Sequence, residues 1–166
     1  MKKNSNPANL STIVVTPGKE NDWQILQKLN KEVYLDNAKY DEDIDADRPM
    51  SSQASENYQA TLADPQNICI FALDGLEDAI GYLVARPTII SYRKSRYLEI
   101  SHMGVLPHWR SKGIGSLLIT ECEKEAKKRG FQKMIVSSYW GNELGRKFYR
   151  QNGFSEIAVE FEKSLK

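Results

Sequence analysis

Arg110, Gly113 and Gly115 follow the spacing Arg-x-x-Gly-x-Gly, and an apolar helical pattern begins directly after them. Glycine is a weak helix former, so two glycines at the start of a helix require another explanation. The first amides of a helix have no intrahelical partner, and glycines leave them open to an approaching ligand. A phosphate is the natural ligand of such a helix start. This stretch is therefore a candidate phosphate-binding site.

Two familiar phosphate motifs do not fit the same stretch. No Gly-Lys-Ser or Gly-Lys-Thr follows the glycines, as a P-loop requires, and the third glycine of the dinucleotide fingerprint is missing. A plain helix-entry loop, in which the glycines only relieve crowding, is the alternative to a binding loop. The glycines by themselves do not decide between these two interpretations.

The strand-like stretch before this loop, "RYLEISHMGVL", changes parity midway. Four apolar residues define the change: Leu98 and Ile100 on one parity, then Met103 and Val105 on the other. Side chains of a regular strand alternate between faces, so one extra residue is needed to keep all four in the same core. We predict a β-bulge near Ser101 and His102, a feature that is common beside active sites.

The remaining elements follow from apolar periodicity and turn signals. The predicted order is a strand at 11–18, a helix at 21–35, a helix from Ser51 or Ser52 to about Leu62, strands at 68–73 and 79–86 paired as an antiparallel hairpin, the strand at 96–106, a helix at 114–129, a strand at 133–138, a helix at 142–151 and a final strand or hairpin at 153–165. This order mixes antiparallel hairpins with one strand-helix-strand crossover, which is typical of a mixed α/β domain.

The composition limits the class of protein. The 166 residues, of which 40% are hydrophobic and 27% charged, suit one domain over 1–166 with a frayed tail at 1–10. No apolar run is long enough to span a membrane, and a formal net charge of +1 offers no global field for nucleic acid. Cys69 and Cys122 lack partner spacing, so we expect neither a disulfide framework nor a metal site. The N-terminus lacks the apolar core of a signal peptide, and we expect a cytoplasmic protein.

Two motifs resemble the GNAT superfamily of N-acetyltransferases. "VLPHWRSKGIGSLLI" is similar to the Arg/Gln-x-x-Gly-x-Gly/Ala signature, and "WGNELGRKFYRQNGF" carries Asn142 and the Tyr149-x-x-x-Gly153-Phe154 spacing of the C-terminal signature. The resemblance covers roughly Tyr97 to the C-terminus, and the upstream order agrees more loosely. It implies an α/β fold with a mixed, mostly antiparallel sheet, a splayed pair formed by the fourth and fifth strands, and about four flanking helices.

The resemblance also implies a co-substrate, acetyl-coenzyme A. Its pyrophosphate would lie on the glycine loop, and its pantetheine arm would enter the sheet near the predicted bulge, where a freed N–H in Met103 to Val105 would stabilise an oxyanion. The implied coenzyme-binding residues are Met103, Val105, Arg110, Ser111, Lys112, Gly113, Ile114, Gly115, Ser116, Asn142 and Arg146. Asn142 has a second role open to it, as the cap of the last helix.

Acetyl transfer to an amine needs a base and an acid. An aliphatic amine with a pKa near ~10.4 is protonated at neutral pH, so a base must take its proton. Glu99 is the first candidate, because its position is similar to that of the glutamate base in the histone-acetylating branch of the family. Many relatives carry an acid where this chain has Ser101, so His102 is the second.

Tyr149 resembles the general acid that protonates the coenzyme thiolate. In the predicted helix at 142–151, Leu144 and Phe148 form an i,i+4 apolar pair, and Tyr149 is turned about 100° from Phe148, so we expect it beside this apolar stripe. Each candidate has a structural alternative. Glu99 could be a solvated charge at the strand edge, His102 a structural histidine and Tyr149 an ordinary aromatic residue of an amphipathic helix.

The acceptor is less constrained. In this family the segment around the first two helices lines the acceptor side, and here it holds "YDEDIDAD" at 40–47. An acidic wall suits a cationic amine such as a polyamine, an aminoglycoside or a lysine-rich peptide, whereas charge runs are usually solvated loops.

The resulting hypothesis is an acetyl-CoA-dependent N-acetyltransferase that acts by direct attack of a primary amine in a ternary complex. A non-catalytic acyl-CoA-binding regulatory module is the alternative, although it would need neither Glu99 nor Tyr149. Balanced charge argues against a nucleic-acid module built on "RSKG" and "KEAKKRG". Many family members dimerise through strand or helix edges, so a homodimer is the expected assembly.

Overall fold

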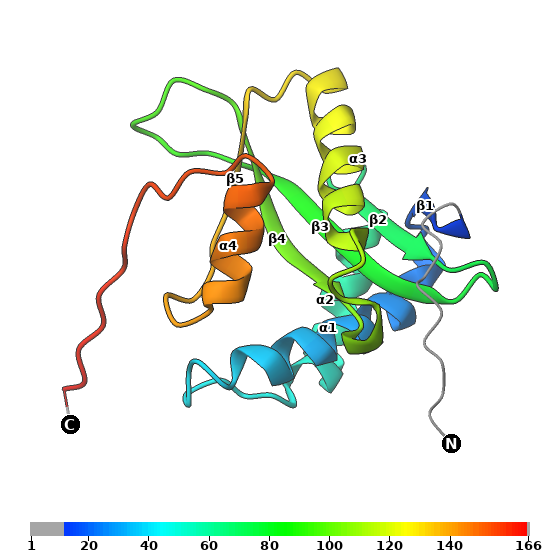
Figure 1. The fold of residues 1–166 in the computed structure, drawn as a ribbon, viewed down its shortest axis with the longest axis horizontal. Helices are drawn as coiled ribbons and strands as arrows, with labels where there is room; N and C mark the ends of the chain where they lie inside the picture. The colour runs from blue at the N-terminus through cyan, green and yellow to red at the C-terminus, as the bar shows by residue number, and fades with distance from the viewer. Residues whose placement is uncertain (1–11, 166) are drawn as a thin grey trace.

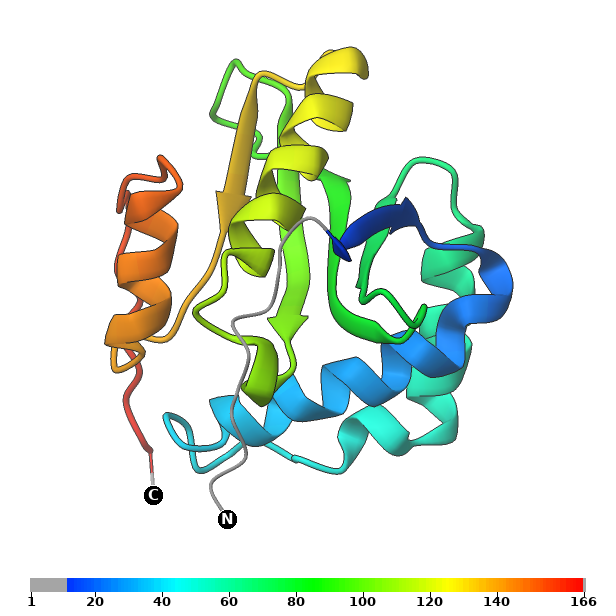
Figure 2. The same cartoon turned by 45° about the vertical axis from the view of Figure 1, so that its right-hand side comes forward.

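The computed structural model describes residues 12–165 and shows a five-stranded sheet between two layers of helices (Figures 1 and 2). The strands are β1 (Val14–Pro17), β2 (Ile68–Leu73), β3 (Ala79–Thr88), β4 (Tyr97–Val105) and β5 (Lys133–Val136). They lie in the order β1-β2-β3-β4-β5, antiparallel except for the β4–β5 pair. The helices are α1 (Trp23–Asn37), α2 (Ser52–Ala63), α3 (Ile114–Lys128) and α4 (Glu143–Gln151). The predicted mixed α/β fold with four helices is confirmed.

Each face of the sheet carries its own core. On one face, Leu118 and Cys122 of α3 are fully buried against β2, β3 and β4, as the apolar stripe of that helix predicts. On the other face, α1 and α2 bury Leu26, Phe71 and Tyr82. Cys69 and Cys122 are both free thiols. Within residues 12–165, no helix has the length and apolar character needed to cross a membrane.

The predicted bulge is present in β4. Val84 pairs with His102 and Ala85 with Ile100, which leaves Ser101 as the extra residue. All four apolar residues whose parity suggested the bulge face the α3-side core: Leu98, Ile100, Met103 and Val105. Because of this one inserted residue, the apolar side chains before and after the bulge face the same core along the nine-residue strand.

β4 and β5 diverge at the bulge. Their ladder runs from the Tyr97–Lys133 pair to the Ile100–Val136 pair, whereas β4 continues beside β3 to Val105. Residues 101–105 form what we call the β4 arm, and residues 137–141, which follow β5, form the β5 arm. The gap between the two arms, called the split below, is the splay that the family resemblance implied.

Helix ends follow the predicted capping chemistry. The Ser51 hydroxyl accepts from the backbone N–H of Ala54 at 3.2 Å, and the Asn142 side chain accepts from that of Gly145 at 2.9 Å. Beyond α3, Gly130 adopts a left-handed conformation with φ 75°, which ends the helix after its cationic last turn. Asn142 thus has the capping role that was one of its two predicted roles.

The predicted strand or hairpin at 153–165 is absent. Ile157, Val159 and Phe161 alternate as in a strand, but all three are exposed and the segment pairs with no strand in the described part of the chain. Figure 1 shows it leaving the end of α4 and running clear of the sheet. Arg150 holds Glu156 beside α4 at 2.5 Å. Alternation alone does not make a strand without a partner for the backbone.

The predicted apolar pair of Leu144 and Phe148 on α4 is also wrong. Leu144 is 80% exposed, so it forms no buried pair with Phe148. Phe148 and Tyr149 instead pack together against the α3-side core, although Tyr149 was expected beside the buried stripe. Both residues lie in the C-terminal half of the nine-residue helix α4.

Replacing Gly104 by Ala is expected to destabilise the protein by about 1–3 kcal/mol, because a Cβ there would lie 2.6 Å from Val33 Cγ2 of α1. Gly75→Ala is the control, since its Cβ would meet only an ordinary 3.6 Å contact. Urea unfolding measures both. Equal midpoints for the two variants would contradict the close packing of α1 on β4.

Candidate active site

The loop between β4 and α3 has the backbone of an anion site. Ser111 (φ 59°) and Gly113 (φ 83°) are both left-handed, and they flank Lys112. Left-handed residues in such a turn aim successive amides at one concave side, an arrangement called a nest. Gly113 is the N-cap of α3 and no side chain caps this helix, so the amides of Ile114 to Ser116 face outward. The structure therefore brings together the predicted loop residues: Ser111, Lys112, Gly113, Ile114, Gly115 and Ser116.

Ser111 is the less expected member of this nest. A non-glycine residue in the left-handed region is strained, and such strain is typical of ligand-binding turns. The sequence held no signal for it, because serine has no preference for this conformation.

Gly115 has a packing role in addition to any role in binding. A Cβ on this residue would lie 2.9 Å from Cζ of Phe148, so only glycine lets α4 dock on the first turn of α3. The two glycines thus serve different purposes: Gly113 supplies a backbone conformation and Gly115 supplies space. Relief of crowding, which was the alternative for both glycines, therefore applies to Gly115.

The two cations of the loop already have partners. The Arg110 Nε donates to the carbonyl of Val105 at 2.8 Å, and its Nη2 lies 2.6 Å from Oδ2 of Asp36 on α1. The Lys112 ammonium lies 4.9 Å from the centre of the Trp109 ring. Burial alone would raise the pKa of Asp36, but hydrogen bonds from Lys39 and Arg110 outweigh it and hold the pKa below its usual value.

Arg146 does not join the loop residues. Its guanidinium lies over the Trp140 ring at 4.0 Å and its Nη1 is 3.6 Å from Glu156. Its buried Nε has no hydrogen-bond partner in the part of the chain that the structure describes. The side chain therefore contacts the region around α4, whereas the nest lies at the start of α3.

Glu99 and His102 lie on the α1 side of the sheet. His102 stands opposite Val84, which belongs to the α1-side core, and Glu99 stands opposite Arg86, whose Nε is 3.4 Å from its carboxylate. Burial lowers the pKa of His102, Arg86 lowers it further, and Glu99 acts in the opposite direction. His102 is therefore a neutral imidazole at neutral pH, next to the bulge and on the same face as Glu99.

Tyr149 lies on the other face of the sheet. It packs against the α3-side core, with its ring edge-on to Phe148 at 5.3 Å and to Phe154 at 5.6 Å. Burial raises the pKa of its phenol to about 12, so the phenol carries its proton throughout the neutral range. The candidate bases and the candidate acid thus lie on opposite sides of the sheet.

The β5 arm borders a groove of about 2010 Å³, and Tyr149 lines it together with Tyr97, Tyr139, Trp140 and residues of the segment 154–162. The Tyr139 hydroxyl donates to Asp41 at 2.9 Å, and its ring stacks on Tyr40 at 6.4 Å. Burial and this hydrogen bond raise the pKa of Tyr139 to about 12. Part of the acidic segment is therefore bound to the β5 arm rather than fully solvated.

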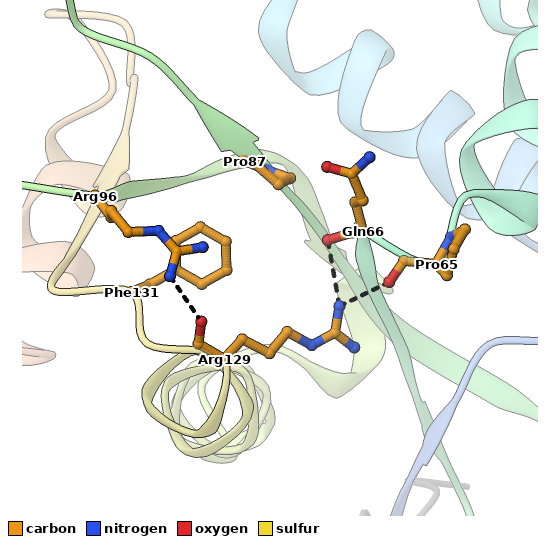
Figure 3. A pocket seen from close by; sticks show the side chains of 6 residues that line it. All are labelled: Pro65, Gln66, Pro87, Arg96, Arg129 and Phe131. Carbon is orange, nitrogen blue, oxygen red and sulfur yellow. Dashed lines mark hydrogen bonds between the residues drawn. The ribbon is translucent and has the colours of Figure 1, made fainter.

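A second depression, of about 300 Å³, lies near the C-terminal end of α3 (Figure 3). Arg129 Nη1 donates to the carbonyls of Pro65, Gln66 and Asn67, and Arg96 Nη1 to those of Arg129 and Gly130. Both arginines therefore join the helix end to neighbouring loops. Residues 12–165 also contain no group of three or more His, Cys, Asp or Glu side chains placed to hold a metal ion.

A family model described as Acetyltransferase (GNAT) family matches residues 24–154, which are most of the chain. The chain belongs to the GNAT acetyltransferase family. A curated relative, the uncharacterized N-acetyltransferase YhfO of Bacillus subtilis (strain 168), is 28% identical over 98 residues, which are 59% of this chain and 65% of that protein. The match thus spans less than two thirds of the relative's length.

Solved structures share the GNAT fold. BH1408 from Bacillus halodurans superposes with a TM-score of 0.82 at 18% identity, over 92% of this chain and 99% of that one. An aminoglycoside acetyltransferase, meta-AAC0020 from an uncultured soil metagenomic sample, was solved with sisomicin. It superposes with a TM-score of 0.72 at 21% identity, over 95% of this chain and 100% of that one. AAC(6')-Iy, solved with a CoA-linked bisubstrate analogue, superposes with a TM-score of 0.70 at 17% identity, over 93% of this chain and 99% of that one.

The geometry of this GNAT chain makes a prediction for His102. Its pKa lies below the ordinary 6.5, so the unfolded chain binds the proton first as pH falls. The free energy of unfolding should therefore rise with pH between the folded pKa and about 6.5, and stay level above it. Imidazole NMR titration of the His108→Gln variant follows His102 alone, since the chain has two histidines. A midpoint at or above 6.5 would contradict the buried, neutral imidazole.

Proposed function

We propose that this GNAT chain is an acetyl-CoA-dependent N-acetyltransferase that transfers an acetyl group to a primary amine in a ternary complex. The single observation that carries the proposal is the nest at 111–113, which opens the first turn of α3 beside a sheet split between β4 and β5. A pyrophosphate suits the nest and the helix start, with Lys112 adding charge. A pantetheine arm suits the split, where one side of the β4 arm lacks a strand neighbour.

The residues support a balanced reaction. Glu99, directly or through a water, takes a proton from the ammonium of the acceptor, and the free amine attacks the thioester carbonyl. A backbone N–H in Met103 to Val105 stabilises the oxyanion. As the C–S bond breaks, Tyr149 gives its proton to the thiolate, and the attacking nitrogen loses its remaining extra proton, which restores the phenol directly or through water. Glu99 then releases its own proton to solvent. His102, neutral and on the same face as Glu99, is the second candidate for the base.

The acceptor we propose is a cationic amine of a small molecule or peptide. The acidic segment at 40–47 follows α1, and Glu99 and His102 lie on the α1 side of the sheet. Meta-AAC0020, which shares the fold, was solved with the aminoglycoside sisomicin. We propose further that the protein acts in the cytoplasm without a metal and forms a homodimer.

Calorimetric titration with acetyl-coenzyme A, followed by a thiol-release screen over polyamines, aminoglycosides and peptides, tests the function. We expect micromolar binding and amine-dependent thiol release. Gly113→Val should abolish binding, because valine resists the left-handed conformation, whereas Tyr149→Phe should keep binding and lower kcat about 10²-fold or more. Binding with no release on any amine would favour the acyl-CoA-binding regulatory module, and no binding would overturn the proposal.

Glu99→Gln and His102→Gln separate the two bases. With an active acceptor in hand, Glu99→Gln should lower kcat about 10²-fold to 10⁴-fold, because the ammonium then loses its proton acceptor. His102→Gln should lower kcat by less than about tenfold, since it removes a neighbour rather than the base. Steady-state kinetics at saturating acetyl-coenzyme A make the comparison. The reverse pattern would assign the base to His102.

A further inference from the structure

The end of α1 and the turn after it contact both arms of the split. Asp36 holds the guanidinium of Arg110 at 2.6 Å, and the Nε of the same guanidinium donates to Val105 at the end of the β4 arm. Asp41 accepts from Tyr139 on the β5 arm at 2.9 Å. Residues 36–41 therefore reach from one arm to the other, and we call them the strap.

The position of the strap is visible in both overall views. Figures 1 and 2 show the C-terminal end of α1 reaching past the end of β4 toward the loop that precedes α4. That loop is the β5 arm. The two strands lose their ladder after Ile100 and Val136, so no backbone bonds join the arms beyond this point in the described chain.

The strap is stiff enough to transmit a constraint. The backbone N–H groups of Ala38, Lys39 and Tyr40 donate to the carbonyls of Tyr34, Asp36 and Asn37 in turn. Tyr40 stacks on Tyr139 with 23° between the ring planes, and its Cδ1 would lie 3.3 Å from a Cβ on Gly141. Ring packing thus supports the Asp41 hydrogen bond on the β5 side.

We propose that residues 36–41 hold the two arms of the split at a fixed separation, and that Asp36 and Asp41 are positioning residues for the coenzyme site. Asp36 acts through Arg110, which also turns the Val105 carbonyl to a set direction. Asp41 acts through Tyr139. The proposal rests on the proposed function, since the group that the arms would enclose is the pantetheine arm of acetyl-coenzyme A.

Two single variants each release one end of the strap. Asp36→Ala removes the carboxylate that holds Arg110, and it leaves a good helix former at a helix end where an acid is unfavourable, so α1 should persist. Tyr139→Phe removes only the hydroxyl and keeps the ring stack. Asp47→Ala is the matched control, because Asp47 lies in the same acidic segment but pairs with Lys31 and touches neither arm.

The dissociation constant for acetyl-coenzyme A, measured by calorimetry, reports the effect. We expect Asp36→Ala and Tyr139→Phe each to weaken binding about threefold to tenfold, and Asp47→Ala to change it less than about twofold. Asp36 and Tyr139 do not touch, so independent roles would multiply in the double variant. If the strap acts as one unit, the double variant should bind acetyl-coenzyme A only slightly more weakly than the single variant with the larger loss.

Three results would overturn the strap: unchanged binding in both single variants, an equal loss in Asp47→Ala, or effects that multiply in the double variant. Failure of the wild type to bind would overturn the proposed function instead. In that case hydrogen exchange of the ligand-free protein tests the strap by itself. Faster exchange at both 101–105 and 137–141 in either single variant supports it, and faster exchange at the released arm alone contradicts it.

Discussion

The ladder between β4 and β5 ends at Ile100 and Val136, and the bulge residue Ser101 lies directly beyond the last pair. The rest of the site depends on this arrangement. β4 continues beside β3 to Val105, which keeps Met103 and Val105 in the α3-side core, whereas β5 ends at Val136 and the chain then leads to α4. Beyond Ile100, one edge of β4 has no strand neighbour among residues 12–165, and the next element along the chain is the loop that enters α3. An open strand edge and an open helix start are therefore close in sequence as well as in space.

The same arrangement separates the ionisable groups by face. Side chains alternate along β4, and the bulge resets the alternation once, so Glu99 and His102 both lie on the α1 side although they are three positions apart. Tyr149 approaches from the α3 side on a helix that docks through Phe148 onto Gly115. In the proposed function, the donor and the acceptor would meet at the split, between the candidate bases on one side of the sheet and the candidate acid on the other.

Much of this could be predicted because it is local. The bulge follows from the parity of Leu98 and Ile100 against Met103 and Val105, and the helix ends follow from Ser51, Asn142 and Gly130. The strand predicted at 153–165 was wrong because alternation specifies faces but supplies no partner for the backbone. The Leu144 and Phe148 pair was wrong for a related reason: helical spacing shows which residues align, whereas the surface they meet decides which of them is buried.

By itself, the sequence determined the class of fold, the bulge, the glycine loop and the family, since each depends on residues within a few positions of one another or on the order of elements. Only the tertiary structure decided which partners the charged residues take. The Arg110–Asp36 and Tyr139–Asp41 contacts join residues 74 and 98 positions apart. Neither pair has a spacing that periodicity can detect. Such contacts arise when separately specified elements pack, and the packed surfaces then decide which carboxylate meets which donor.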